Sequence, residues 1–222
     1  LMIRQGLRLR NRALNLPEPD GPRSGRTGNG SPLRLLIMGD SSAAGVGVTH
    51  QTGALSGQLA AALSHSFDLS WRLEATTGDT TAATLRRLHA LPAQPFDAVV
   101  QALGVNDVTS GIPSTLWMRQ QRQLHDLCRE KFGMKRLYVS GLPPMRHFPL
   151  LPPYMQWILG GEAERFDKTL QRISSEEPDM RHIPFDQPLE PNMMASDGFH
   201  PGPEVYHLWA EAIAAHIIAD FS

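Results

Sequence analysis

Apolar and amphipathic segments alternate along the chain from residue 33 onward. Five short segments are either continuously apolar or alternate apolar with polar residues, which predicts β-strands. They are residues 33–39, 69–75, 96–104, 135–141 and 180–186. Between and after them, apolar residues recur at helical spacing. This spacing predicts helices at residues 53–67, 80–91, 114–132, 161–174 and 203–221.

Strands that alternate with helices indicate parallel βαβ units. The pattern therefore predicts an α/β fold, a three-layer α/β/α sandwich with a five-stranded parallel sheet. In open sheets of this kind, ligands bind at the carboxyl ends of the strands. We therefore expect functional side chains just after each predicted strand.

Residues 1–32 differ from the rest of the chain. They hold six arginines against Glu18 and Asp20, and residues 16–32 have the Pro, Gly, Ser and Arg content of a linker. We predict a basic extension over residues 1–32 and a single domain over residues 33–222. The extension is either a solvated segment lying on the domain or the inner flank of an anchor removed from upstream. A cytoplasmic location and a membrane-anchored or periplasmic one both stay open.

Net charge, cysteine count and the length of the apolar runs exclude several classes of protein. The 222 residues include 21 basic and 22 acidic ones, and a net charge of -1 argues against a nucleic-acid binder. One cysteine excludes an internal disulfide framework and a multi-cysteine metal site. No apolar run approaches the roughly 18 residues of a membrane-spanning helix. We expect no metal, no cofactor, no nucleic-acid partner and no spanning segment.

Glycines and polar side chains follow four of the predicted strands. The four groups are residues 39–42 (Gly-Asp-Ser-Ser), 77–79 (Thr-Gly-Asp), 104–107 (Gly-Val-Asn-Asp) and, across a loop, 197–200 (Asp-Gly-Phe-His). The stability of a domain does not require Ser, Asn, Asp and His together at one edge of its sheet. These groups therefore predict a catalytic site.

The residue types fit nucleophilic catalysis. A serine hydroxyl needs a base to take its proton, and His200 is a candidate base for Ser41. Asp197 lies three residues before His200, so a single turn presents both side chains and the carboxylate can orient the imidazole. Pro201 disfavours helical geometry at His200 and keeps it in the loop before the last helix.

An acyl-transfer site also needs hydrogen-bond donors for the oxyanion that develops on the substrate. Three candidates follow the predicted strands: the backbone N–H near Ser41, the backbone N–H of Gly78, and the side-chain amide of Asn106. Gly78 has no side chain to block approach to its amide. Asn106 donates without carrying a charge.

With these residues in place, the sequence resembles the SGNH (GDSL-type) hydrolase superfamily. The four groups occur in the order typical of that family and span residues 39 to 200. The resemblance implies a flavodoxin-like sheet and hydrolysis of esters, thioesters or acetylated sugars. It also implies Ser41 as nucleophile, Gly78 and Asn106 as oxyanion donors, and Asp197 with His200 as the rest of a catalytic triad. Ser42 replaces a leucine of the family, which leaves a second hydroxyl beside Ser41.

Several residues near these groups also have other interpretations. Residues 39–47 are glycine-rich but lack the endings of phosphate-binding loops. We interpret Asp40 and Asp107 as structural, with Asp107 bonding backbone at the Asn106 turn. The remaining candidates, interpreted as ordinary helix residues, are His125, Cys128, His207 and His216.

The segment 141–161 is long, rich in proline and rich in large apolar side chains. Because it follows the fourth predicted strand, we expect it at the edge of the site, as an acyl-binding wall or lid, as a cover on the core, or as both. The candidate substrate-binding residues are Met145, Phe148, Leu151, Tyr154 and Phe199.

Together these features predict a serine esterase that acts on a small-molecule or lipid-like ester. The apolar segment favours acyl esters of lipid or aryl type. Two alternatives stay open: a carbohydrate O-acetylesterase or acyltransferase with the same triad, and a binding protein without catalysis. The oligomeric state is not predicted.

Overall fold

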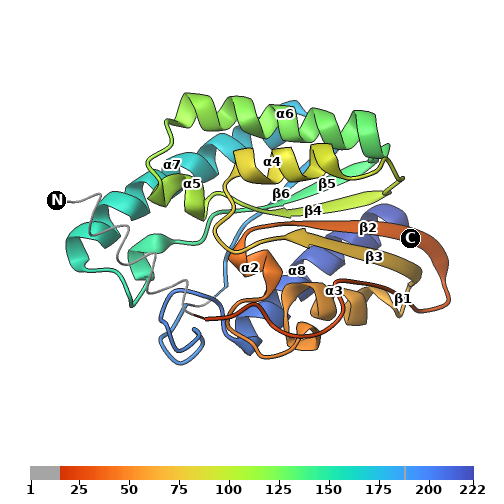
Figure 1. Ribbon diagram of the computed structural model, residues 1–222, viewed down its shortest axis with the longest axis horizontal. Coiled ribbons are helices and arrows are strands. Elements are labelled where there is room, and N and C mark those ends of the chain that lie inside the picture. Colours follow the sequence, from red (N-terminus) through yellow and green to blue (C-terminus); the bar gives the residue numbers. More distant parts are fainter. Residues whose placement is uncertain (1–15, 188) are drawn as a thin grey trace.

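A six-stranded sheet runs through the computed structural model, which describes residues 16–187 and 189–222 (Figure 1). The strand order is β1-β3-β2-β4-β5-β6. The strands are β1 (Ser24–Thr27), β2 (Ser31–Gly39), β3 (Phe67–Ala75), β4 (Ala98–Ala102), β5 (Arg136–Ser140) and β6 (Met180–Ile183). Strands β2 to β6 pair in parallel, and β1 pairs antiparallel with β3 at one edge of the sheet.

Helices cover both faces of this sheet (Figure 1). One face carries α2 (Ser41–Ala44), α3 (Leu55–Leu63) and α8 (Pro203–Phe221), with the short 3₁₀ helix η1 (Gln51–Gly53). The other carries α4 (Thr81–Ala90), α5 (Val105–Thr109), α6 (Ser114–Phe132) and α7 (Pro153–Glu176). A second 3₁₀ helix, η2 (Met145–His147), precedes α7. The fold is therefore the three-layer α/β/α sandwich that the alternation predicts.

Burial of the second half of β2 explains the uninterrupted apolar run at residues 35–38. Leu35 and Ile37 point into the core shared with α3 and α8, whereas Leu36 and Met38 point into the core shared with α4, α6 and α7. Successive side chains of a strand face opposite sides, so a strand covered on both faces must be apolar at every position.

The parallel part of the sheet has the flavodoxin-like strand order. Numbered among themselves, the five parallel strands follow the order 2-1-3-4-5. In this order, the strand connections leave in opposite directions on either side of the crevice between β2 and β4. Ligands bind at such a crevice, outside the carboxyl ends of the strands. Residues after β2 and after β4 therefore share the position where a site is expected.

Residues 16–32 are not the linker that their composition predicts. Part of this segment forms β1, which pairs with β3 from Ser24↔Arg72 to Thr27↔Leu69, and the sheet has six strands instead of five. A short polar strand can form here because pairing with β3 satisfies its backbone hydrogen bonds. Residues 1–15, which carry four of the six arginines, lie outside the described residues.

The segment 141–161 is a loop only in its first half. Helix α7 begins at Pro153, eight residues before the helix that the sequence predicts. Proline suits the first helical position because its missing N–H has no intrahelical partner there. Gly160 lies inside this helix, where a Cβ atom would come within 2.2 Å of Arg146 Cγ. The glycine is therefore a close packing position, and the loop is shorter than predicted.

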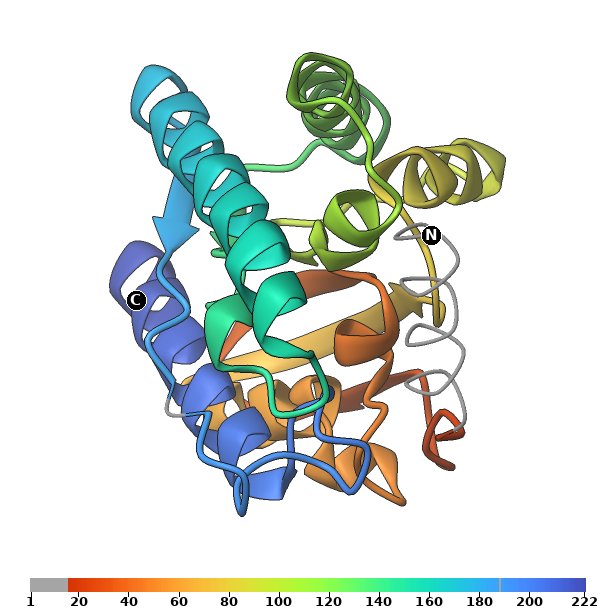
Figure 2. The same cartoon turned by 90° about the vertical axis from the view of Figure 1, so that its left-hand side faces the viewer.

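Figure 2 looks onto the carboxyl ends of the parallel strands. The start of α2, the segment before α7 and the loop before α8 all reach this edge of the sheet (Figure 2). In the described part of the chain, every helix is too short or too polar to cross a membrane.

Candidate active site

Ser41 begins helix α2, immediately after β2 ends at Gly39. A Cβ atom on Gly39 would lie 2.4 Å from the carbonyl oxygen of Ala102, so only glycine allows β2 and β4 to approach this closely. Asp40 continues the pairing, with its N–H donating to Ala102 O over 3.2 Å. The chain then turns into α2, which leaves the Ser41 side chain at the crevice between the two strands.

Asp40 separates the roles of the two adjacent serines. Its side-chain Oδ1 accepts from the Ser42 backbone N–H at 3.0 Å and from the Ser42 hydroxyl at 2.8 Å. The Ser41 hydroxyl instead lies 2.8 Å from Nε2 of His200. Ser42 therefore donates to Asp40, the N-cap residue of α2, and the Ser41 hydroxyl is the one that faces the imidazole.

His200 connects Ser41 to Asp197. Its Nδ1 lies 2.6 Å from Asp197 Oδ2, and the other carboxylate oxygen accepts from the backbone N–H groups of His200 and Phe199 at 3.0 and 2.9 Å. Burial opposes ionisation of Asp197, but these hydrogen bonds and the attraction of His200 outweigh it and hold the carboxyl pKa below its ordinary value. An ionised Asp197 favours the imidazole tautomer with its Nδ1–H toward the carboxylate, which leaves Nε2 as the nitrogen that faces the Ser41 hydroxyl.

Two contacts hold the loop of His200 against the loop of Ser41. A Cβ atom on Gly47 would lie 2.2 Å from Pro201 O, and the φ of +112° at Gly47 also favours glycine. The Tyr206 hydroxyl on α8 donates to Val46 O at 2.7 Å. Segments 159 residues apart in sequence are thereby held within hydrogen-bond distance.

The turn after β3 presents Gly78, one of the predicted oxyanion donors. Gly78 has φ +84°, which favours glycine, and the N–H of Asp79 closes the turn on Thr76 O at 3.1 Å. The Asn106 side-chain amide donates one of its N–H groups to Asp79 O at 3.1 Å. The turn of Gly78 and the side chain of Asn106 are therefore joined by a hydrogen bond, and neither residue lines the apolar pocket described below.

Asp107 bonds backbone, as its interpretation as a structural residue requires. Its carboxylate accepts from the Thr81 backbone N–H at 3.1 Å and from the Thr81 hydroxyl at 3.1 Å. Burial raises the pKa of Asp107 to about 6, although the Thr81 hydrogen bonds oppose the shift. Burial also raises the pKa of Asp40, against the effect of its bonds to Ser42. Asp40 therefore holds the segment of Ser41 through its bonds to Ser42, and Asp107 links the segment of Asn106 to Thr81.

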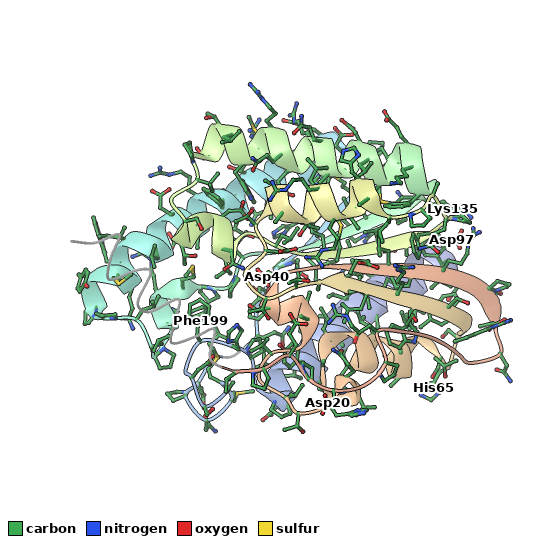
Figure 3. The ribbon with its side chains drawn as sticks, viewed as in Figure 1. Asp20, Asp40, His65, Asp97, Lys135 and Phe199 are labelled. Atoms are coloured by element: carbon green, nitrogen blue, oxygen red, sulfur yellow. The ribbon has the colours of Figure 1, made fainter. Side chains whose placement is uncertain are left out.

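An apolar pocket opens beside Ser41 and His200. It lies between the ends of β4 and β5, the segment before α7 and the start of α8. The apolar side chains that line it are Leu103, Val105, Leu142, Phe148, Phe185, Leu189, Met194, Phe199 and Trp209. Figure 3 shows Phe199 at this end of the molecule, near Asp40. Such a pocket suits the hydrocarbon part of a substrate.

The five candidate substrate-binding residues divide between three environments. Phe148 and Phe199 line the pocket and pack edge to face with ring centroids 5.0 Å apart. Met145 and Leu151 are buried in the core beneath α7. Tyr154 is 44% exposed on the first turn of α7.

The remaining histidines and the cysteine lie away from this site. His125 and Cys128 are buried in helix α6, where burial lowers the pKa of His125 to about 3 and raises that of Cys128 to about 12. His207 and His216 lie on α8, where they hydrogen-bond to Gln58 and Arg181. Within residues 16–187 and 189–222, no group of three or more His, Cys, Asp or Glu side chains can hold a metal ion.

Sequence reasoning missed the residues that support the site from a distance. Glu18 and Arg87 both hold the turn of Gly78, although neither follows a strand of the parallel sheet. Leu142 lines the pocket two residues after β5 ends at Ser140, so its position after a predicted strand was a usable signal. No local pattern marks Glu18, which lies in a segment of linker composition.

A parallel α/β sheet with a hydrogen-bonded Ser–His–Asp chain at the carboxyl ends of its strands is an arrangement found in serine hydrolases. Residues 37–208 match the GDSL-like Lipase/Acylhydrolase family. The chain belongs to this family and is a carboxylic ester hydrolase. No curated protein matches the sequence significantly.

Several solved structures have a similar fold. TesA is 23% identical with a TM-score of 0.67, and the match covers 83% of this chain and 99% of TesA. The acetylxylan esterase Axe2 from Geobacillus stearothermophilus is 16% identical with a TM-score of 0.68, over 85% of this chain and 95% of Axe2. The esterase EstA from Pseudoalteromonas sp., in a structure inhibited by monoethylphosphonate, is 20% identical with a TM-score of 0.63, over 83% of this chain and 96% of EstA.

Proposed function

We propose that the protein hydrolyses carboxylic acyl esters with Ser41 as nucleophile, His200 as general base and acid, and Asp197 as the residue that orients the imidazole. The observation that carries this proposal is the chain of contacts at the pocket mouth, 2.8 Å from Ser41 Oγ to His200 Nε2 and 2.6 Å from His200 Nδ1 to Asp197. These distances lie within the range that proton transfer requires.

In the first half-reaction, Ser41 Oγ attacks the ester carbonyl carbon while its proton passes to His200 Nε2. The carbonyl oxygen becomes an oxyanion, which accepts from the backbone N–H groups of Ser41 and Gly78 and from the side-chain amide of Asn106. The ester C–O bond then breaks, and His200 gives its proton to the departing alcohol. Asp197 stabilises the imidazolium throughout.

In the second half-reaction, water attacks the acyl group bound to Ser41, and His200 Nε2 takes the water proton. The second tetrahedral intermediate uses the same oxyanion donors. When it collapses, the carboxylic acid leaves and the proton returns from His200 to Ser41 Oγ. The cycle needs no metal ion or organic cofactor.

The lining of the pocket supports an ester with an apolar acyl or aryl group. Leu103, Leu142 and Phe148 belong to three different segments, and all of them line the pocket beside the nucleophile. The similarity in fold to the acetylxylan esterase Axe2 keeps a sugar acetate as the competing substrate. In that case the sugar would lie outside the pocket and only the acetyl group would enter it.

A fluorophosphonate probe with intact-mass readout tests the nucleophile. The probe choice follows the phosphonate-inhibited esterase EstA, whose fold is similar. We expect one adduct on the wild type at neutral pH, none on Ser41→Ala, and one on Ser42→Ala. The absence of an adduct on the wild type would leave a non-catalytic binding protein as the interpretation. An adduct on Ser41→Ala would move the nucleophile elsewhere.

A panel of 4-nitrophenyl esters of increasing acyl length, measured beside acetylated xylan oligosaccharides, tests the substrate class. We expect kcat/KM to rise from the acetyl to longer acyl esters, and Phe148→Ala to reduce that rise. A higher kcat/KM for the acetylated oligosaccharides than for every aryl or longer-chain ester would replace the proposed substrate with a sugar acetate.

A further inference from the structure

An N-terminal segment, residues 18–27, runs beside the active site and is named the strap here. Its last four residues form β1, paired antiparallel with β3, so going backward along the strap leads toward the carboxyl end of β3. Asp20 then bonds the loop after α2, donating to Thr49 O at 3.2 Å and accepting from the Gln51 N–H at 2.7 Å. Figure 3 labels Asp20 below the sheet, on the side that carries α3 and α8. The strap therefore touches both the Ser41 loop and the strand that leads to Gly78.

Glu18 contacts the residue before Gly78. Its Oε1 accepts from the Thr77 backbone N–H at 2.7 Å and from the Thr77 hydroxyl at 2.8 Å. Both distances are ordinary for hydrogen bonds to a carboxylate, and bonds of this type are about twice as strong as neutral ones. Glu18 is 59 residues from Thr77 in sequence, so this is a tertiary contact and not a feature of the turn itself.

Arg23 holds the Glu18 carboxylate in place. Its guanidinium lies 3.0 Å from Glu18 Oε2 and also donates to the carbonyl oxygen of Ala75, the last residue of β3. One carboxylate oxygen of Glu18 therefore accepts from Thr77, and the other pairs with Arg23. An arginine anchored on β3 therefore fixes the acceptor that Thr77 uses.

The other side of the same turn is held from α4. Arg87 donates to the Thr76 hydroxyl and to the Asp79 carboxylate. Gly78 therefore lies between Thr77, held by the strap, and Asp79, held by α4. A glycine has the widest backbone freedom of any residue, so its N–H direction depends on what restrains its neighbours.

We propose that Glu18 is a positioning residue for the oxyanion hole, acting through Thr77 on the direction of the Gly78 N–H. The inference rests on the proposed function, because it assigns Glu18 a role in the step where Gly78 stabilises the oxyanion. Glu18 touches no reacting atom. Its effect is to hold a donor where negative charge develops, and donors aimed in advance stabilise the transition state more than the bound ester.

Steady-state kinetics of Glu18→Ala with 4-nitrophenyl acetate test the proposal. We expect kcat to fall about tenfold and KM to stay within about twofold, because a misdirected donor costs less than a missing one. Inhibition by phenylboronic acid, which forms a tetrahedral adduct on the nucleophile, should weaken by the same factor as kcat/KM. In Glu18→Gln the amide oxygen still accepts from Thr77, and kcat should return to within about threefold of the wild type.

Asp68→Asn is the matched control. Asp68 pairs with Arg26 of the strap at the opposite end of β3 from Gly78, on the protein surface. The variant removes an acidic partner of the same strap, and we expect kcat and boronate inhibition within about twofold of the wild type. Thermal unfolding of both variants measures any general loosening of the strap.

The outcomes separate this inference from the proposed function. A wild type that the fluorophosphonate probe does not label overturns both. A labelled wild type with an unchanged kcat in Glu18→Ala overturns only the role of Glu18. Equal losses of kcat in Glu18→Ala and Asp68→Asn also overturn it, because the effect would then come from strap stability. A fall in kcat confined to Glu18→Ala, with weaker boronate inhibition, supports it.

Discussion

Asp97 at the amino end of the parallel sheet and the supporting aspartates Asp40 and Asp107 at its carboxyl end have pKa shifts of opposite direction. Figure 3 shows Asp97 and Lys135 at the amino end of the strands and Asp40 near the carboxyl end. At the amino end, Asp97 accepts from the Arg34 guanidinium at 2.8 and 2.9 Å and pairs with Lys135 at 2.9 Å. The hydrogen bonds from Arg34 hold the pKa of Asp97 far below its ordinary value, although burial opposes the shift.

At the carboxyl end, Asp40 and Asp107 accept hydrogen bonds from hydroxyl and backbone N–H groups of Ser42 and Thr81. Burial raises the pKa of both carboxyl groups. At the amino end, the ion pairs therefore stabilise the charged form of Asp97 and the folded state. At the carboxyl end, burial disfavours the charged forms of Asp40 and Asp107, which lowers the unfolding free energy. Such a cost is common where the surrounding structure holds a functional site in place.

The most severe change at the carboxyl end is Asp197→Asn. We expect kcat to fall by roughly 10⁴, because asparagine orients the imidazole in the wrong tautomer. The Oδ1 bonds to the N–H groups of Phe199 and His200 can persist, so the loop should keep its shape. Ester hydrolysis rates and thermal unfolding measure the two effects. A variant that keeps more than a tenth of wild-type kcat would contradict the role of Asp197.

Asn106→Ala removes a proposed oxyanion donor without touching the Ser41–His200 contact. We expect kcat to fall by about 10² to 10³ with the unfolding free energy little changed. Thr109→Ala is the control on the same short helix, since the Thr109 hydroxyl only donates to Asn106 O at 3.3 Å. Equal losses in both variants, measured as kcat on the same ester, would assign the effect to α5 and not to the amide.

Asp107→Asn tests the stability cost at the carboxyl end through its pH dependence. The folded pKa of about 6 lies above the ordinary value of 3.8, so the folded state binds the proton more tightly than the unfolded state. The stability from this group is complete below the ordinary value and is lost as pH rises through the folded pKa. Asparagine stays neutral throughout. The unfolding free energy of the variant should therefore gain on that of the wild type by up to about 3 kcal/mol as pH rises through this window.

Denaturant unfolding of both proteins, from acidic to neutral pH, measures this gain. Altered hydrogen bonds to Thr81 change the unfolding free energy of the variant by an amount that does not vary with pH. The prediction therefore concerns how the difference between the two proteins changes with pH. A difference that stays constant across the range would show that Asp107 ionises as easily in the folded protein as in the unfolded chain.

Asp97→Asn tests the amino end, where stability should change and activity should not. We expect a loss of about 1–2 kcal/mol in unfolding free energy at pH 7, with kcat within twofold of the wild type. Because the folded pKa of Asp97 lies below the ordinary 3.8, this stabilisation is present above that value and is lost as pH falls further. Unfolding curves at neutral and strongly acidic pH measure it. A fall in kcat would show that the two ends of the sheet are coupled.

Local patterns in the sequence predicted the sheet and the side chains at its carboxyl edge. The apolar runs of the five parallel strands reflect burial on both faces, which any such sheet requires. Asp197 and His200 share one turn, so their pairing also follows from spacing. The apolar segment before α7 was located correctly, but its inward residues Met145 and Leu151 could not be told from the pocket residue Phe148. Which side chains of an irregular segment face a pocket depends on packing against other elements.

The sequence by itself therefore determined the α/β class, the strand ends that carry chemistry, and the candidate triad. The tertiary structure supplied the reason that Ser41 and not Ser42 faces His200, which is that Asp40 holds the Ser42 hydroxyl. It also turned residues of linker composition into the strap, with Glu18 on Thr77. Contacts between residues far apart in sequence leave no periodic pattern, because each depends on one pair of side chains that folding brings together.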